Sequence, residues 1–222
     1  ITCSGLLNPV TVTLTVKDVN GNSAANTAQV TVNDTIAPIA VTKNAVVGLD
    51  NDGFVTVDPQ VVDNGSWDNC DIETWILDTA LFSCSDIGNP ITVLLTIADK
   101  MNNTDTASAV ITIVDNAPPM VKTQDIEIAL DSMGSATITW DDIDNGSTDG
   151  CEIDTFALDI SEFDCSNLAA PVTVSLTVTD IYGNSASETA LVTVNDPIAP
   201  IAKTQNAVVG LDDDGFVTVD PQ

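Results

Sequence analysis

The chain of 222 residues carries 33 Asp and Glu against five Lys, which gives a formal net charge of −28 at pH 7. It contains no Arg and no His. Nucleic-acid binding is therefore excluded, because it needs a cationic surface, and so are Ser or Cys nucleophiles that depend on a His base. Hydrophobic residues make up 44% of the chain and charged residues 17%, which predicts packed cores rather than a disordered acidic tail. We expect no membrane span in this segment, because no apolar run reaches the roughly 18 residues that a spanning helix needs.

Alternating apolar and polar residues begin close to the start of the chain. Residues 10–17 (VTVTLTVK) place valine and leucine on one side of a strand and mostly threonine on the other, which is typical of an antiparallel strand with one wet face. Six or seven short strands in about 80 residues, without helical periodicity, predict an all-β fold of immunoglobulin-like β-sandwiches. In chain order, the further strands are predicted at 45–49, 53–58, 72–78, 106–114 and 172–179, with turns at Asp52-Gly53, Asn64-Gly65, 88–90 and 102–103.

The cysteines reveal an internal repeat of 81 residues. Cys3, Cys84 and Cys165 are equally spaced, and Cys70 and Cys151 follow the same period. A second, longer repeat period is also present, because segment 44–60 recurs at 206–222 with a single change. The sequence therefore predicts tandem modules of 81 residues in an extended array, of which this chain is a window.

Linkers that contain proline set the expected module boundaries, because proline cannot donate to a sheet and stiffens a connection. They lie at 33–40, 114–121 and 195–202. The predicted units are the C-terminal part of one immunoglobulin-like repeat at 1–36, complete repeats at 37–116 and 117–197, and the N-terminal part of a further repeat at 198–222.

Three motifs carry a resemblance to a known family. They are TVNDxxAP at 31–38 and 193–200, DNGSxDxC at 63–70 and 144–151, and LTVxDxxGN at 14–22 and 176–184. Together they resemble the tandem extracellular repeats of the hyalin-repeat kind found in large surface and adhesin-type proteins of Bacteroidota. The resemblance implies a bacterial surface protein whose repeats serve mostly as stalks.

Two cysteines, 14 residues apart, fall in each complete repeat. Paired cysteines in a small repeat without histidine are typical of a disulfide framework in an oxidising compartment. We therefore expect the disulfides Cys70–Cys84 and Cys151–Cys165 within modules, and a partner outside the chain for Cys3. The alternative is a pair of reduced, buried thiols.

Aspartates recur at the ends of strands and at the linkers, where hard oxygen ligands for Ca²⁺ would converge between two modules. The alternative is that these residues only cap turns, which Asp and Asn commonly do. The candidate ligands for Ca²⁺ at the module junctions are Asp18, Asp34, Asp63, Asp68, Asp99, Asp115, Asp144, Asp149, Asp180 and Asp196.

No catalytic constellation emerges from the sequence, and we do not expect an enzyme. The leading hypothesis is a secreted, extracellular or cell-surface repeat protein that forms a rod, stalk or filament. Its partners would be neighbouring modules, or copies of itself in a fibre. The alternative is an adhesin whose modules bind surface glycans or proteins directly.

Overall fold

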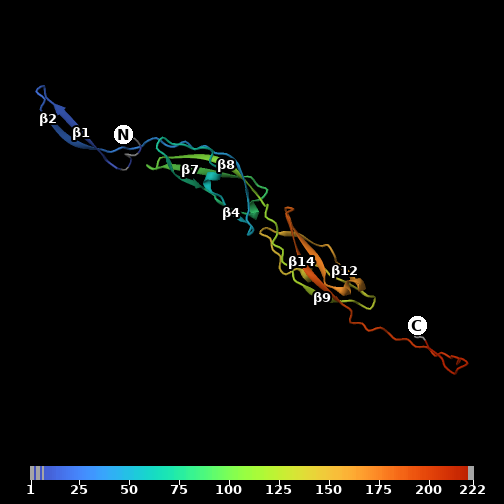
Figure 1. Ribbon diagram of the computed structural model, residues 1–222. Helices are drawn as coiled ribbons and strands as arrows, with labels where there is room; N and C mark the ends of the chain where they lie inside the picture. Colours follow the sequence, from blue (N-terminus) through green and yellow to red (C-terminus); the bar gives the residue numbers. More distant parts are fainter. Residues whose placement is uncertain (1–2, 4–5, 7, 220–222) are drawn as a thin grey trace.

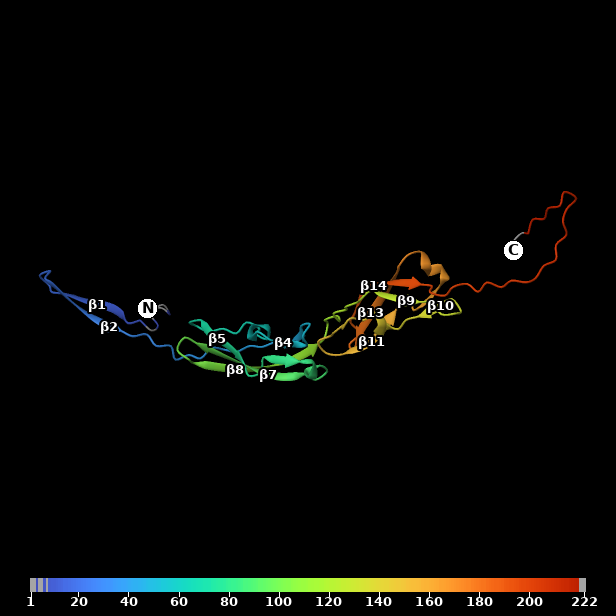
Figure 2. The ribbon, with the colours of Figure 1, turned by 90° about the horizontal axis from the view of Figure 1, so that it is seen from below.

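The computed structural model describes Cys3, Leu6 and residues 8–219. Its elements follow one another along one direction, from an N-terminal hairpin through two β-sandwiches to an extended C-terminal segment (Figures 1 and 2). The β-sandwich fold predicted from the sequence is confirmed, because most regular elements are strands and they form a larger and a smaller sheet in each sandwich.

The first sandwich consists of a four-stranded sheet and a two-stranded sheet. The larger sheet has the order β3-β8-β7-β5, and the smaller pairs β4 with β6. Most pairings are antiparallel, but β3 runs parallel to β8. Its elements are β3 (Ala45–Gly48), β4 (Phe54–Thr56), η2 (Pro59–Val61), β5 (Ile72–Leu77), β6 (Leu81–Ser83), η3 (Cys84–Asp86), β7 (Ile91–Asp99) and β8 (Thr104–Val114).

The second sandwich repeats this arrangement strand by strand. Its larger sheet has the order β11-β13-β14-β9, with β9 parallel to β14, and its smaller sheet pairs β10 with β12. Its elements are β9 (Ile126–Ala129), β10 (Ser135–Thr137), α1 (Trp140–Ile143), β11 (Ile153–Leu158), β12 (Glu162–Asp164), η4 (Cys165–Ala169), β13 (Val172–Asp180) and β14 (Ser185–Asn195). Among the described residues, no helix is long and apolar enough to cross a membrane.

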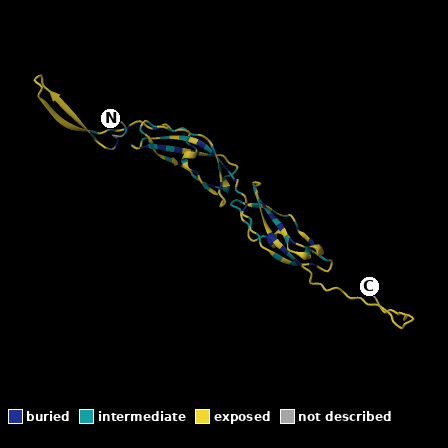
Figure 3. Ribbon diagram, in the orientation of Figure 1, coloured by how far each residue is buried: buried dark blue, intermediate teal, exposed yellow. Residues whose placement is uncertain are grey.

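Each sandwich encloses its own core, because the apolar residues that alternate along its strands face the opposite sheet. Leu95, Ile97 and Ile111 are fully buried in the first core, and Leu176, Val178 and Val192 in the second. Buried residues accordingly form two separate patches along the ribbon (Figure 3).

The N-terminal hairpin has no such core. Strands β1 (Val10–Lys17) and β2 (Ser23–Val30) pair with each other antiparallel and form a sheet of two strands. Nearly all their residues are exposed. Residues 201–219 are likewise exposed and contain no strand.

Candidate cation and disulfide sites at the joints

Both disulfides cross a joint between two units of the chain. The first joint, where the N-terminal hairpin segment meets the first sandwich, is closed by Cys3–Cys70. The second joint, between the two sandwiches, is closed by Cys84–Cys151. The sequence separation is 67 residues in both cases, and the Cα atoms lie 5.4 and 5.5 Å apart. Cys165 is a free, exposed thiol.

The predicted pairs Cys70–Cys84 and Cys151–Cys165 are therefore wrong, and so is the prediction that Cys3 lacks a partner within the chain. Strand β5 separates Cys70 from Cys84, and six residues of strand span about 20 Å. A disulfide requires Cα atoms within about 7 Å of each other. The two cysteines of one sandwich thus lie at its opposite ends and serve two different joints.

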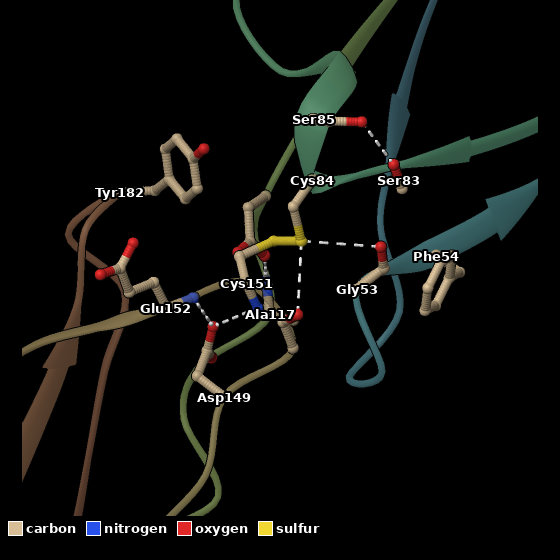
Figure 4. The surroundings of a disulfide bond; sticks show 12 residues. Gly53, Phe54, Ser83, Cys84, Ser85, Ala117, Asp149, Cys151, Glu152 and Tyr182 are labelled. Carbon is tan, nitrogen blue, oxygen red and sulfur yellow. Dashed lines mark hydrogen bonds between the residues drawn. A yellow bond between two sulfur atoms is a disulfide. The ribbon is translucent and has the colours of Figure 1, made fainter.

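The second joint is packed backbone against backbone around its disulfide (Figure 4). Gly53 has a φ of +79°, and a Cβ atom built on it would lie 2.3 Å from the carbonyl oxygen of Gly150. A Cβ on Gly150 would lie 2.4 Å from the Gly53 nitrogen. Two glycines are therefore needed where the turn between β3 and β4 meets the loop that carries Cys151.

The two joints share one local geometry. The sulfur of Cys84 lies 3.3 Å from the carbonyl oxygen of Gly150, and the sulfur of Cys3 lies 3.3 Å from that of Asn69. Because disulfide sulfurs carry no proton, these are close contacts rather than hydrogen bonds. Gly150 and Asn69 each directly precede the second cysteine of the bridge.

Three of the predicted aspartates meet at the first joint. Asp34 comes from the linker, Asp68 from the loop before Cys70, and Asp99 from the end of β7; one carboxylate oxygen of each lies within 4.8 Å of the others. Asn103 joins linker and sandwich, since its Nδ2 donates to the Asp34 carbonyl at 3.1 Å and to Asp99 Oδ2 at 2.7 Å. Asn69 Nδ2 donates to Asp34 Oδ2 at 2.9 Å.

Burial and hydrogen bonding act in opposite directions on Asp99. Its side chain is 2% exposed, and this burial would raise the pKa of the carboxyl. Hydrogen bonds from Asn103 and from the backbone N–H of Met101 outweigh it, so the pKa of Asp99 lies below its ordinary value. Asp99 therefore remains a carboxylate although it is buried.

The second joint gathers the corresponding residues. Asp115 and Asp149 approach each other with the Cys151 sulfur, again within 4.8 Å. Asn184 Nδ2 bridges the Asp115 carbonyl and Asp180 Oδ2, at 3.2 and 2.7 Å. Burial, together with the nearby charges of Asp149 and Asp180, raises the pKa of Asp115. A carboxylate at this position is thus destabilised unless a cation neutralises it.

Five predicted ligands lie outside these clusters: Asp180, which adjoins the second cluster through Asn184, and four that cap turns. Asp63 and Asp144 accept hydrogen bonds from the backbone of their own turns, at Ser66 and Ser147. Asp18 is exposed and bonded to Asn22, and Asp196 accepts from the Ile198 N–H. For these four the turn-capping alternative describes what the structure shows.

Each cluster fits a hard divalent cation in part. Ca²⁺ takes six to eight oxygen ligands, and carboxylates of two or three aspartates meet at each joint. Within the described chain, Asp68 Oδ1 is buried and accepts no hydrogen bond, so this oxygen is available as a ligand. Cys151 is not a suitable ligand, because its sulfur belongs to a disulfide. Carbonyl and water oxygens would have to complete the coordination.

The glycines that build the second joint were not identified from the sequence, nor were the bonds by which two asparagines hold the linkers. Asn103 and Asn184 occupy the same place in the GN-type motif, and their spacing from Asp99 and Asp180 was visible in the sequence. Their contacts to the linker carbonyls bridge 69 residues, and no local pattern predicts such a distance.

The chain matches no protein-family model, and no curated protein matches it in sequence. Among solved structures it is similar to extracellular cadherin domains 1–4 of protocadherin gamma B7, with 11% identity, a TM-score of 0.34, and coverage of 87% of this chain and 59% of that one. It is also similar to titin domains I67–I69, with 10% identity, a TM-score of 0.32 and coverage of 88% and 76%. The four N-terminal immunoglobulin domains of Dscam1 align with 10% identity, a TM-score of 0.31 and coverage of 79% and 51%. The chain thus spans less than two thirds of the cadherin-domain chain.

Proposed function

We propose that this chain is a structural, non-enzymatic part of an extracellular rod or stalk, built from tandem modules at 37–116 and 117–197 with partial modules on either side. The observation that carries the proposal is that both disulfides cross joints instead of stapling single modules. A covalent bond at this place limits how far two neighbours bend and separate. The motifs at 63–70 and 144–151 support a bacterial surface protein of the hyalin-repeat kind.

Ca²⁺ is the second component of the proposed joint. It would bind to Asp34, Asp68 and Asp99 at the first joint, and to Asp115, Asp149 and Asp180 at the second. A bound cation would offset the repulsion among these carboxylates and hold the linker against the end of the sandwich. In a chain with a net charge of −28, such neutralisation also lowers the general repulsion between modules.

Small-angle X-ray scattering of the full chain tests the proposal. We expect a rod-like distance distribution with Ca²⁺ and intact disulfides, and a broader, more flexible distribution after addition of chelator and reductant. An Asp115→Asn variant should lose the response to Ca²⁺ at the second joint, while Asp63→Asn, with the same charge change outside the clusters, should retain it. A flexible chain under all conditions would contradict the rod, and an unchanged response in Asp115→Asn would contradict the cation site.

A further inference from the structure

The end of the second sandwich that lies away from the second joint carries an exposed surface. The equivalent surface of the first sandwich is buried at the second joint. This end face consists of the turn Asp131–Gly134, the linker residues Asp196–Pro200, and Cys165. Turn and linker border a hollow of about 310 Å³. The corresponding turn and linker of the first sandwich, Asp50–Gly53 and Asp115–Pro119, lie at the second joint, where the loop Asp149–Cys151 contacts them.

The end face has the geometry of the occupied joint. Gly134 has a φ of +78°, close to the +79° of Gly53. The Cys165 sulfur lies 3.9 Å from the Gly134 carbonyl oxygen, as the Cys84 sulfur lies 3.6 Å from that of Gly53. A Cβ on Gly134 would meet only Cys165, at 3.1 Å, where the same atom on Gly53 meets Gly150.

The exposure of the linker aspartates also distinguishes the end face from the two joints. The linker aspartate is buried at both joints, with Asp34 at 7% and Asp115 at 8% exposure. Asp196, the third linker aspartate, is exposed, and so is Cys165. The end face therefore combines a preformed contact surface with the one thiol, among the described cysteines, that is not in a disulfide.

We propose that the end face is the docking site for the cysteine-bearing loop of a further module of the same kind, and that Cys165 forms a disulfide with the cysteine of that loop. This inference rests on the proposed function, since it extends the same joint by one module. The step needs a disulfide donor, such as an oxidised low-molecular-weight thiol. The two protein thiols form one disulfide, and the donor leaves as two thiols.

The chain itself indicates the occupant. Residues 206–222 repeat 44–60 with one change, so the segment after the end face has the sequence with which the first sandwich begins. In the first sandwich this sequence leads into the loop that carries Cys70, which is bonded to the cysteine of the preceding unit. A module completed after residue 222, with glycine before this cysteine as at the second joint, would bring the corresponding loop to Cys165.

The test is to complete that module. Residues 61–116 are appended to the full chain, with Asn69→Gly in the appended copy so that its loop is the Asp-Gly-Cys seen at the second joint. Peptide mapping by mass spectrometry under non-reducing conditions should find Cys165 bonded to the appended copy of Cys70. Cys165 should also lose its alkylation by iodoacetamide, and the appended copy of Cys84 should carry the free thiol. A disulfide between the two appended cysteines, with Cys165 still alkylated, would overturn the proposal.

A matched variant and a second probe keep the test independent of folding of the appended module. Valine in place of that appended glycine should restore alkylation of Cys165, because its Cβ would collide with the Gly134 turn. On the unextended chain, a peptide of residues 144–153 activated as a mixed disulfide at Cys151 should react with Cys165 faster than its Gly150→Val counterpart. Equal rates for the two peptides would also contradict docking. Neither readout depends on Ca²⁺ or on rod shape, so the proposed function is tested separately.

Discussion

At the scale of single residues, Asp115 and Asp63 are expected to respond oppositely to neutralisation. The pKa of Asp115 is raised by burial and by two neighbouring carboxylates, so its ionised form costs stability in the folded chain at neutral pH. Asp115→Asn should therefore raise the melting temperature in cation-free buffer at pH 7. The gain should vanish as the pH falls towards 3.8, the ordinary Asp value, because the wild-type carboxyl is then protonated in the folded state.

Asp63 is the control, because its pKa is shifted in the opposite direction to that of Asp115. Burial alone would raise its pKa, but hydrogen bonds from Ser66 and Gly65 prevail, so the pKa is lowered. Its carboxylate stabilises the fold above the ordinary value of 3.8, and this contribution is lost as the pH falls through the lowered pKa. Asp63→Asn should accordingly lower the melting temperature at pH 7. If Asp115→Asn lowers the melting temperature as Asp63→Asn does, the assignment of Asp115 as a destabilising carboxylate is wrong.

The close contact of two glycines at the second joint yields another prediction. Gly53→Ala should weaken the joint, because its Cβ would lie 2.3 Å from the Gly150 oxygen and 2.8 Å from the Cys84 sulfur. Gly65→Ala is the matched control, since Gly65 also has a positive φ, +85°, but no atom lies within 4 Å of its Cβ. Both variants should lose about 1 kcal/mol for the left-handed backbone. Only Gly53→Ala should also accelerate reduction of Cys84–Cys151 by dithiothreitol, measured by thiol release; equal acceleration in both would contradict the contact.

At the scale of elements, one leucine position separates complete sandwiches from the hairpin. Leu14, Leu95 and Leu176 occupy the same place in β1, β7 and β13, but Leu14 is 70% exposed and the other two are fully buried. Leu95→Ala or Leu176→Ala should cost about 2–5 kcal/mol of unfolding free energy, whereas Leu14→Ala should change it by less than about 0.5 kcal/mol. Denaturant unfolding measures all three. A comparable loss for Leu14→Ala would show that β1 packs against partners that this structure lacks.

The elements also show how far the sequence predicts the structure. The alternating patterns predicted strands at 45–49, 72–78 and 106–114, and the structure places β3, β5 and β8 there within two residues. Period-two alternation reports which face of a strand is wet, yet the predicted strands left out β2, β7 and β14, each at least eight residues long. It did not predict β6, only three residues long, or the parallel pairing of β3 with β8, because neither is encoded in local alternation.

The residues at the joints were predicted only in part. Composition and periodicity placed acids at the linkers, and two linker acids, Asp34 and Asp115, do lie in the clusters. The disulfide pairs failed because separation along the chain was taken as a guide to distance. Strand β5 carries the chain from one end of the sandwich to the other between Cys70 and Cys84. Cys70 is therefore close to Cys84 in sequence but far from it in space.

At the scale of the whole molecule, the disulfides determine which parts of the chain are stretched under tension. A pulling force that enters at Cys3 passes through the first disulfide to Cys70, along the chain to Cys84, and through the second disulfide to Cys151. The 67-residue stretches that the two bridges span are thus shielded from the force. When its sandwiches unfold under tension, a stalk joined in this way lengthens less than one without the bridges.

Single-molecule stretching of the full chain, held at its two ends, measures this shielding. Reduction should add two increments of contour length, each about 220–240 Å, which is the reach of 67 residues at 3.3–3.6 Å per residue. A Cys84→Ser/Cys151→Ser variant should already show one increment without reductant. Bridges within modules, between Cys70 and Cys84 and between Cys151 and Cys165, would instead hide only about 50 Å each. Increments of that smaller size would contradict the joint-crossing disulfides and, with them, the covalent continuity on which the proposed rod depends.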